Sequence, residues 1–426
     1  MPVEICPLPK TRNVDSINAA FESIYKKTPT FYIRVPGRVN LIGEHVDYCG
    51  YGVCPMALEQ DIFLAVATDD TQKKLNLHNL DKKYESYECP LDTIEIVLND
   101  AAPKWYQYFL CGVKGVLELL GETERNKIKG LEVMVDGSIP QSAGLSSSSA
   151  LVSAAALATT HSFQVCCAKL IEFEPLRSAE VQLPPGAVFV IAHSMAKMNK
   201  AATTDFNSRV VECRLAAQII GQRKGLDWTG VRRLGDLQKT LGVTLDEMIA
   251  LTKEILHERP YSKEGVIREL NTTSTQLDRL SLTPNTRDIQ SFKLHQRALH
   301  VFNEAKRVQQ FYETCKNMTG GEDSLLLLGN LMSRSHESLK ELYECSHEAL
   351  DRIVDLAKGL TLGTRLTGAG WGGCTVSLVA SENVEKFVNL LIESFYKPLG
   401  VTDGFESLVF RTEPMDGARV YTPITK

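Results

Sequence analysis

One short segment, residues 36–48, constrains this chain most, because it gathers four polar side chains directly after an apolar strand pattern. It reads P-G-R-V-N-L-I-G-E-H-V-D-Y and carries Arg38, Glu44, His45 and Asp47. Carboxylates accept several O–H donors in defined directions, and a guanidinium is permanently charged. The cluster indicates a binding site for a small polar ligand; a solvated surface salt-bridge cluster is the alternative.

A second segment, residues 144–150, reads G-L-S-S-S-S-A and runs into the alanine-rich stretch 151–160, so we predict a loop that opens a helix. The first N–H groups of a helix lack internal partners, and its dipole adds about half a positive charge, which suits a phosphate. A serine N-cap would explain one of the four serines, and the other hydroxyls remain for a metal. No G-x-x-x-x-G-K-[ST] sequence occurs, so this is not a P-loop.

A third segment, residues 366–376, reads L-T-G-A-G-W-G-G-C-T-V and formally matches G-x-G-x-x-G. A dinucleotide-binding loop is followed by a helix, whereas residues 374–379 are strand-like. The protein-kinase sequences V-A-I-K, H-R-D and D-F-G do not occur in residues 377–426. Two interpretations remain, a tight structural hairpin and a loop that supports the other two segments.

Together the three segments resemble the ordered signatures of the GHMP small-molecule kinases, and residues 37–48 have the galactokinase form. The continuation C-G-Y-G-V-C-P-M-A-L-E-Q-D, residues 49–61, is most similar to the N-acetylgalactosamine kinase branch. This resemblance covers nearly the whole chain. It implies an α/β (α+β), two-domain GHMP kinase fold. Residues 1–195 would form a mixed-sheet N-terminal domain, and residues 196–426 a helix-rich C-terminal domain with a ferredoxin-like sheet.

The resemblance also implies an ATP-dependent sugar 1-kinase that phosphorylates N-acetylgalactosamine, or galactose, at the anomeric hydroxyl, with ATP and Mg²⁺ as cofactors. Glu44, His45 and Asp47 would hydrogen-bond the sugar hydroxyls. Arg38 would lie near the anomeric hydroxyl, where its charge stabilises the alkoxide and the transferring phosphoryl group.

For the nucleotide, the resemblance implies that Gly144, Ser146 and Ser147 contact the ATP phosphates and that Ser148 is the magnesium ligand. Small residues in this loop let phosphates approach the backbone.

The resemblance also implies roles for three residues in the range 199–206. Asn199 and Lys200 match a pair that contacts the nucleotide in N-acetylgalactosamine kinase; for Lys200 a solvated surface lysine is the alternative. Phe206 stands where galactokinases have a sugar-contacting Tyr, and the loss of that hydroxyl favours the acetamido sugar.

The chain departs from the family pattern after the serine loop. Relatives reach a segment like G-G-G-M-D-Q, whose Asp is the catalytic carboxylate, before the strand that matches residues 165–173 here. Residues 151–164 run directly into that strand. We therefore expect an internal deletion near residues 164–166, in an exon-skipped isoform or a faulty gene model. The string G-G-E-D at residues 320–323 is interpreted as a chance match.

This departure leaves three functional interpretations open. The first is residual kinase activity. Loss of a general base lowers the rate by about 10²- to 10⁴-fold, but positioning and charge stabilisation supply much of the catalysis of phosphoryl transfer. A non-catalytic sugar- and ATP-binding isoform or sensor is the second. A product without a stable fold is the third, because a deletion exposes the neighbours of the lost segment and leaves their hydrogen bonds unpaired.

Composition narrows the class of partner. The net charge of -5 gives no general reason to bind nucleic acid or an acidic membrane. Eleven cysteines without C-x-x-C pairs favour reduced thiols over a disulfide framework or a zinc site. Without an apolar leader or a bilayer-length apolar run, we expect a cytoplasmic monomer whose partners are the sugar and ATP.

Periodicity predicts the order of elements along the chain. Helices are expected over 15–27, 105–120 and 383–396, and strands over 31–35, 61–68, 131–135, 187–192 and near Leu408. Residues 203–358 read as mostly helical, with 290–314 and 323–345 the longest helices, and 363–379 as strand, glycine loop and strand.

Overall fold

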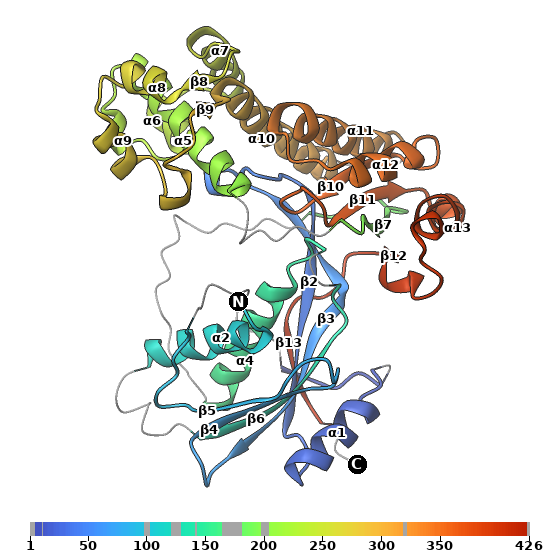
Figure 1. Ribbon diagram of the computed structural model, residues 1–426. Helices are drawn as coiled ribbons and strands as arrows, with labels where there is room; N and C mark the ends of the chain where they lie inside the picture. The colour runs from blue at the N-terminus through green and yellow to red at the C-terminus, as the bar shows by residue number, and fades with distance from the viewer. Residues whose placement is uncertain are drawn as a thin grey trace.

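The computed structural model describes residues 5–10, 12–97, 103–120, 129–140, 143–163, 181–196, 204–317 and 322–423. A large mixed sheet with three packed helices occupies one end of the molecule, and a helix-rich part with a smaller sheet occupies the other (Figure 1). The predicted combination of a mixed-sheet part and a helix-rich part is confirmed.

The large sheet has seven strands within the described residues, in the order β1-β13-β2-β3-β6-β4-β5. Its pairs are antiparallel except for β1 with β13 and β4 with β6, which are parallel. The strands are β1 (Ile5–Pro7), β2 (Phe31–Ile42), β3 (Cys54–Asp69), β4 (Lys74–Asn79), β5 (Tyr87–Pro90), β6 (Gly130–Gly137) and β13 (Arg419–Thr422).

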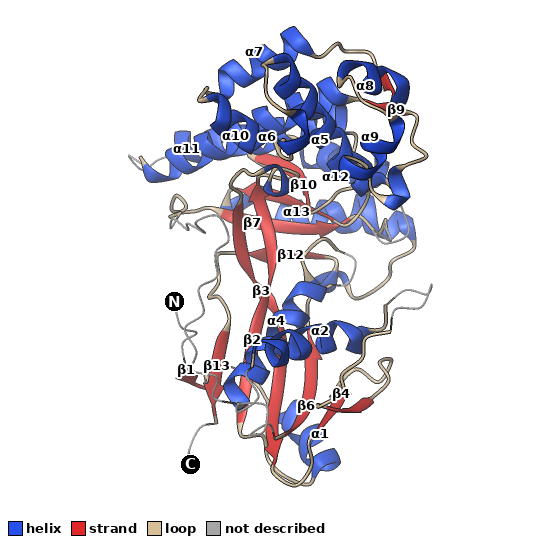
Figure 2. Cartoon of the chain, turned by 90° about the vertical axis from the view of Figure 1, so that its left-hand side faces the viewer, coloured by secondary structure: helices blue, strands red, loops and turns tan. Residues whose placement is uncertain are grey.

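Both faces of this sheet are covered, because alternate side chains of a strand point to opposite faces. On β3, Leu64 and Val66 pack with α2 (Trp105–Leu119) and α4 (Ser147–Ser162), which lie in front of the strands in Figure 2. Phe63 and Ala65 face the other way, toward α1 (Asp15–Tyr25). Residues 62–67 of the strand are therefore all apolar.

The strand predicted over 31–35 is much longer in the structure. β2 continues to Ile42 through the first motif, pairs with β3, and has register shifts between Pro36 and Arg38 and between Asn40 and Ile42. Arg38 thus lies at an irregularity of the sheet, a common position for functional side chains. β1, β4, β5 and β13 are short strands that periodicity did not predict.

The helix-rich part confirms the mostly helical prediction for residues 203–358. The predicted long helices correspond to α10 (Leu294–Lys316) and to α11 (Glu322–Ser338), which ends in a π-helical turn, Leu339–Tyr343. The others are α5 (Asp205–Arg223), α6 (Leu234–Leu241), α7 (Leu245–Ile255), α8 (Lys263–Glu269), α9 (Ser274–Leu280), α12 (Glu348–Ala357) and α13 (Val384–Leu391), with β8 (Tyr261–Ser262) paired to β9 (Ser291–Phe292).

The smaller sheet is antiparallel, in the order β10-β11-β7-β12. Its strands are β7 (Val188–His193), β10 (Gly363–Thr367), β11 (Cys374–Val379) and β12 (Val409–Thr412). β7 precedes the predicted boundary at residue 195 yet pairs with C-terminal strands, while β13 returns to the large sheet. The boundary stays a prediction, and the apparent deletion near 164–166 lies outside the described residues.

Candidate functional site

The first motif forms a loop, residues 43–48, at the end of β2. β2 runs from the large sheet toward the helix-rich part, so this loop meets α10 (Figure 1). Gly43 has φ +104, and a Cβ there would lie 3.0 Å from a methyl carbon of Val308 in α10 and 3.1 Å from Val53 Cα. Only glycine fits this conformation and this close approach.

Glu44 joins the loop to the third motif. Its Oε1 accepts hydrogen bonds from the Gly368 N–H at 2.7 Å and from the Thr367 hydroxyl at 3.1 Å. Burial raises the pKa of the Glu44 carboxyl, and the positive charge of Arg365, 3.8 Å away, opposes that rise. The loop that connects β10 to β11 therefore orients the carboxylate, as the supporting interpretation of this segment predicts.

His45 lies at φ +63 among aromatic rings and uses both ring nitrogens within the protein. Nδ1 lies 2.9 Å from the Tyr48 hydroxyl and Nε2 2.9 Å from the Ala369 carbonyl oxygen. Because a carbonyl can only accept, Nε2 donates, and the neutral ring accepts from Tyr48 at Nδ1. His45 thus fixes the shape of the loop, while its sugar contact stays a prediction.

The serine loop docks on the irregularity of β2. The Arg38 N–H donates to the Leu145 carbonyl at 3.0 Å, and Arg38 Nη1 donates to the Gly144 carbonyl at 3.4 Å. Gly144 has φ +74, and a Cβ there would lie 3.0 Å from the Thr367 carbonyl of the third motif. Three segments more than a hundred residues apart in sequence therefore meet at one place.

The predicted helix begins at Ser147, with Ser146 at the N-cap position. Ser146 has φ +63, and its side chain makes no capping hydrogen bond. The first-turn amides of α4 are therefore not satisfied by the N-cap side chain that the sequence suggested. Ser147 is half-buried, and Ser148 and Arg38 are exposed. This combination of a cation and a helix N-terminus suits an anionic ligand.

Four other residues that the sequence predicts for the site are Asp47, Asn199, Lys200 and Phe206. Asp47 is exposed at the start of a 3₁₀ turn, Asp47–Cys49. The Phe206 ring lies 5.6 Å from that of Tyr48 and 5.9 Å from that of His45, between centroids. Asn199 and Lys200 lie outside the described residues.

Sequence reasoning missed the residues behind the loop. The Tyr343 hydroxyl lies 2.5 Å from that of Tyr48. Two buried charges also lie behind the loop: Arg365 near the Glu44 carboxylate, and Glu304 at the Gly43 N–H. These side chains are hundreds of residues from the first motif, so no local spacing could have identified them.

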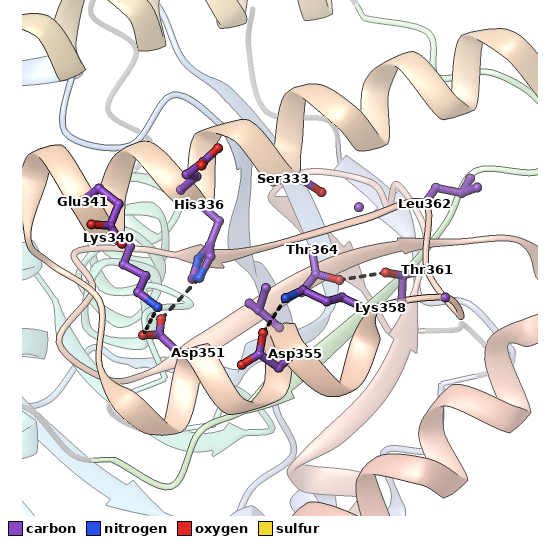
Figure 3. A pocket seen from close by; sticks show the side chains of 14 residues that line it. Ser333, His336, Lys340, Glu341, Asp351, Asp355, Lys358, Thr361, Leu362 and Thr364 are labelled. Carbon is purple, nitrogen blue, oxygen red and sulfur yellow. Dashed lines mark hydrogen bonds and ion pairs between the residues drawn. The ribbon is translucent and has the colours of Figure 1, made fainter.

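A separate cavity of about 560 Å³ lies between α11, α12 and the start of β10, and it contains none of the predicted site residues (Figure 3). Its polar groups pair with one another: Asp351 accepts from His336 Nε2 at 3.3 Å and from Lys340 at 3.0 Å. On its other side, His336 Nδ1 accepts from the Leu366 N–H at 3.3 Å. His336 therefore holds the backbone of β10, the strand that leads into the third motif.

Two buried histidines make the stability of this region sensitive to acid. Burial lowers the pKa of His300 in α10 to about 4, although Glu304 opposes this; burial likewise lowers the pKa of His336 to about 4, although Asp351 opposes it. Arg307, Arg365 and Lys340 also face these rings and favour the neutral forms. In the unfolded chain both rings titrate near 6.5.

We therefore expect the free energy of unfolding to fall as the pH decreases from about 6.5 to about 4, by up to about 3 kcal/mol for each ring. The sign follows because only the unfolded state binds these protons in that window. Urea unfolding at several pH values measures the effect, with His336→Gln as a variant that removes one titrating ring. An equal acid response in this variant and the parent chain would contradict the assignment to His336.

Within the described ranges, no three His, Cys, Asp or Glu side chains gather as a candidate metal cluster. Over the same residues, the helices are too short or too polar to cross a bilayer.

Three family models match this chain. The galactokinase galactose-binding signature matches residues 19–68, the GHMP kinases N-terminal domain matches residues 108–180, and the GHMP kinases C-terminal model matches residues 322–396. The three matches contain the three motifs in order.

Curated relatives match over most of their length. The chain is 36% identical to the galactokinase of Dictyostelium discoideum, over 90% of this chain and 88% of the relative. It is 30% identical to the galactokinase of Saccharomyces cerevisiae, over 97% of this chain and 96% of the relative. The second alignment spans 506 positions, more than the 426 residues here, so that relative contains residues without a counterpart in this chain.

Solved structures share the fold. The crystal structure of Lactococcus lactis galactokinase complexed with galactose superimposes with a TM-score of 0.69 at 21% identity, covering 96% of this chain and 99% of that chain. The mevalonate kinase of Methanococcus jannaschii gives a TM-score of 0.51 at 18% identity, covering 90% and 98%.

Proposed function

This chain belongs to the galactokinase family of the GHMP kinases, and from that premise we propose that it transfers the γ-phosphoryl group of ATP to the anomeric oxygen of a galactose-type sugar. One observation carries the proposal: Arg38 of the sugar motif contacts the carbonyls of Gly144 and Leu145 in the serine loop. A permanent positive charge thus lies beside a helix N-terminus, where sugar and phosphate must meet for transfer.

On the sugar side, Arg38 would stabilise the developing charge on the anomeric oxygen and the transferring group. Glu44 and Asp47 would accept hydrogen bonds from the sugar hydroxyls. Glu44 is suited to this role because the third motif fixes its orientation, and Asp47 because it is exposed. The ring nitrogens of His45 contact Tyr48 and Ala369, so we propose that His45 contacts the sugar through its ring face, next to the Phe206 ring.

On the nucleotide side, Gly144, Ser146 and Ser147 would contact the ATP phosphates, with the amides of the first turn of α4 as further donors. Ser148 would hold Mg²⁺. An exposed hydroxyl fits this ion, which takes few protein ligands and completes its shell with substrate phosphates and water. When bound, the ion would neutralise phosphate charge. Asn199 and Lys200 would contact the nucleotide.

We propose that the family's catalytic carboxylate is absent, so that only positioning and charge stabilisation by the residues present remain and this chain transfers the phosphoryl group slowly. The alternative is a non-catalytic isoform that binds sugar and ATP. The relatives' additional aligned residues favour it, because a missing segment can remove the base and leave both binding loops intact.

Labelled phosphoryl transfer from MgATP to N-acetylgalactosamine and to galactose tests the proposal. Sugar 1-phosphate that requires both MgATP and sugar would support it. Binding of both ligands without product would favour the non-catalytic isoform, and a folded chain that binds neither would overturn both.

We further propose that N-acetylgalactosamine is the preferred sugar, because Phe206 lacks the hydroxyl with which a Tyr could hydrogen-bond galactose. Phe206→Tyr is expected to shift the preference toward galactose by about tenfold, since the hydroxyl gains a partner only in the galactose complex. The ratio of the two dissociation constants measures this shift. Phe206→Leu, which adds no hydroxyl, is the matched control. An unchanged ratio in Phe206→Tyr would contradict the proposal.

A further inference from the structure

We propose that α10 and α11 form a backbone clamp on the 43–48 loop, in which His300 and Glu304 are positioning residues for sugar binding. The clamp acts on peptide groups of Gly43 and Glu44, and not on the sugar itself. Its link to sugar affinity rests on the proposed function, whereas the clamp itself is a feature of the unliganded protein.

Two contacts define the clamp. Glu304 Oε1 accepts from the Gly43 N–H at 3.0 Å, and His300 Nε2 donates to the Glu44 carbonyl at 3.3 Å. Residues 300 and 304 are one turn apart on the same side of α10, so a single helix face holds two consecutive residues of the loop. Because the two contacts flank the Gly43–Glu44 peptide bond, they fix both the position and the rotation of Glu44.

A second layer from α11 holds the clamp residues. The Ser335 hydroxyl donates to Glu304 Oε1 at 2.7 Å, and the Ser338 hydroxyl lies 2.8 Å from His300 Nδ1. Since the Glu44 carbonyl can only accept, His300 carries its proton on Nε2 and accepts from Ser338. These four side chains are buried.

The Glu304 carboxylate is ionised despite its burial. Burial favours the neutral form, but Arg307, whose Nε lies 2.7 Å from Oε2, and Arg365 outweigh it and lower the pKa of Glu304 to about 2. Its contact with the Gly43 N–H is therefore charge-assisted, which makes it stronger than a bond between neutral groups.

The position of these groups favours a role beyond stability. Buried ion pairs are often replaceable by apolar residues without loss of stability, so their presence under a loop calls for another reason. The clamp contacts the backbone of the two residues that precede His45, and one of them, Glu44, carries the carboxylate proposed to bind the sugar. Arg365, which faces Glu304, also lies 3.8 Å from that carboxylate. The same cluster thus acts on the backbone and the side chain of Glu44.

Hydrogen exchange of the unliganded chain tests the clamp without any assay of function. Glu304→Asp keeps the charge but shortens the side chain. His300→Asn places its side-chain amide near the position of Nδ1, but this amide does not reach the Glu44 carbonyl. Both variants are expected to accelerate hydrogen exchange of a peptide covering residues 43–48 by about tenfold, which is the effect of losing one hydrogen bond. His300→Gln, whose amide reaches the position of Nε2, is expected to restore most of the protection.

Asp61→Asn is the control for a general loss of stability. Asp61 is as buried as Glu304 and is paired with Arg34 and Arg12, but it lies on β3 opposite Pro36, outside the 43–48 loop. This variant is expected to leave exchange of the 43–48 peptide unchanged. Unchanged exchange in both Glu304→Asp and His300→Asn would overturn the clamp.

Calorimetric titration with N-acetylgalactosamine and with MgATP tests the positioning role. Glu304→Asp and His300→Asn should raise the dissociation constant of the sugar about tenfold and that of MgATP by less than about twofold, with recovery in His300→Gln. Equal weakening of both ligands, or faster exchange without weaker sugar binding, would overturn this role. A parent chain that binds no sugar would instead refute the proposed function, and hydrogen exchange would still decide the clamp.

Discussion

Inserting the G-G-G-M-D-Q-type segment, which we propose is deleted near residues 164–166, is expected to raise the rate of phosphoryl transfer by about 10²- to 10⁴-fold, the usual contribution of a general base. The segment would be inserted between Gln164 and Val165, where the serine-loop helix pattern runs directly into the next strand pattern. Because Arg38 already contacts the serine loop in this chain, the insertion would add the proposed carboxylate to motifs that lie together. Single-turnover transfer to N-acetylgalactosamine measures the gain.

The matched control is the same insertion with its Asp replaced by Asn. This control should recover any stability that the segment supplies, because it restores the neighbours' packing and hydrogen bonds, while the rate stays near that of the parent chain. Equal rates in the Asp and Asn insertions would show that the segment acts through folding alone. An unchanged rate in the folded Asp insertion would refute the assignment of the base to this position.

In the restored chain, Arg38→Ala should lower turnover by about 10²- to 10³-fold, the usual effect of removing one donor to charge that develops in the transition state. Arg38 is exposed, so the unfolding free energy should change by less than about 0.5 kcal/mol. Arg38→Lys should recover part of the rate, because an ammonium keeps the charge but lacks the planar fork. Turnover and thermal unfolding are measured together.

Lys74→Ala is a suitable control for the loss of an exposed cation, since Lys74 pairs with Glu88 on the distant β4–β5 pair. It is expected to leave turnover unchanged. If Arg38→Ala weakened MgATP binding and left turnover at saturation intact, Arg38 would act in binding the nucleotide and not in the transfer step.

Local patterns in the sequence determined most of the elements. Helical spacing gave α1, α2 and α10 to within a few residues, because one apolar face of each packs on a sheet or on neighbouring helices. The strand after the third motif excluded a dinucleotide fold, and β11 confirms that strand. The three motifs are short runs of glycine, serine and charged residues, so local spacing is enough to identify them.

Long-range contacts decided the rest. β13 pairs with β2 across nearly the whole chain, and β7 joins the C-terminal sheet, because strand pairing depends on which edges the tertiary fold brings together. The sequence predicts His45 as a sugar ligand, and only the structure shows that its ring nitrogens lie beside the Tyr48 hydroxyl and the Ala369 carbonyl; the sugar contact stays a prediction. The sequence by itself determined which segments carry the family motifs. Only the tertiary structure decided what holds them, since the hydrogen bonds that join Glu304 and His300 to the 43–48 loop link residues more than 250 positions apart.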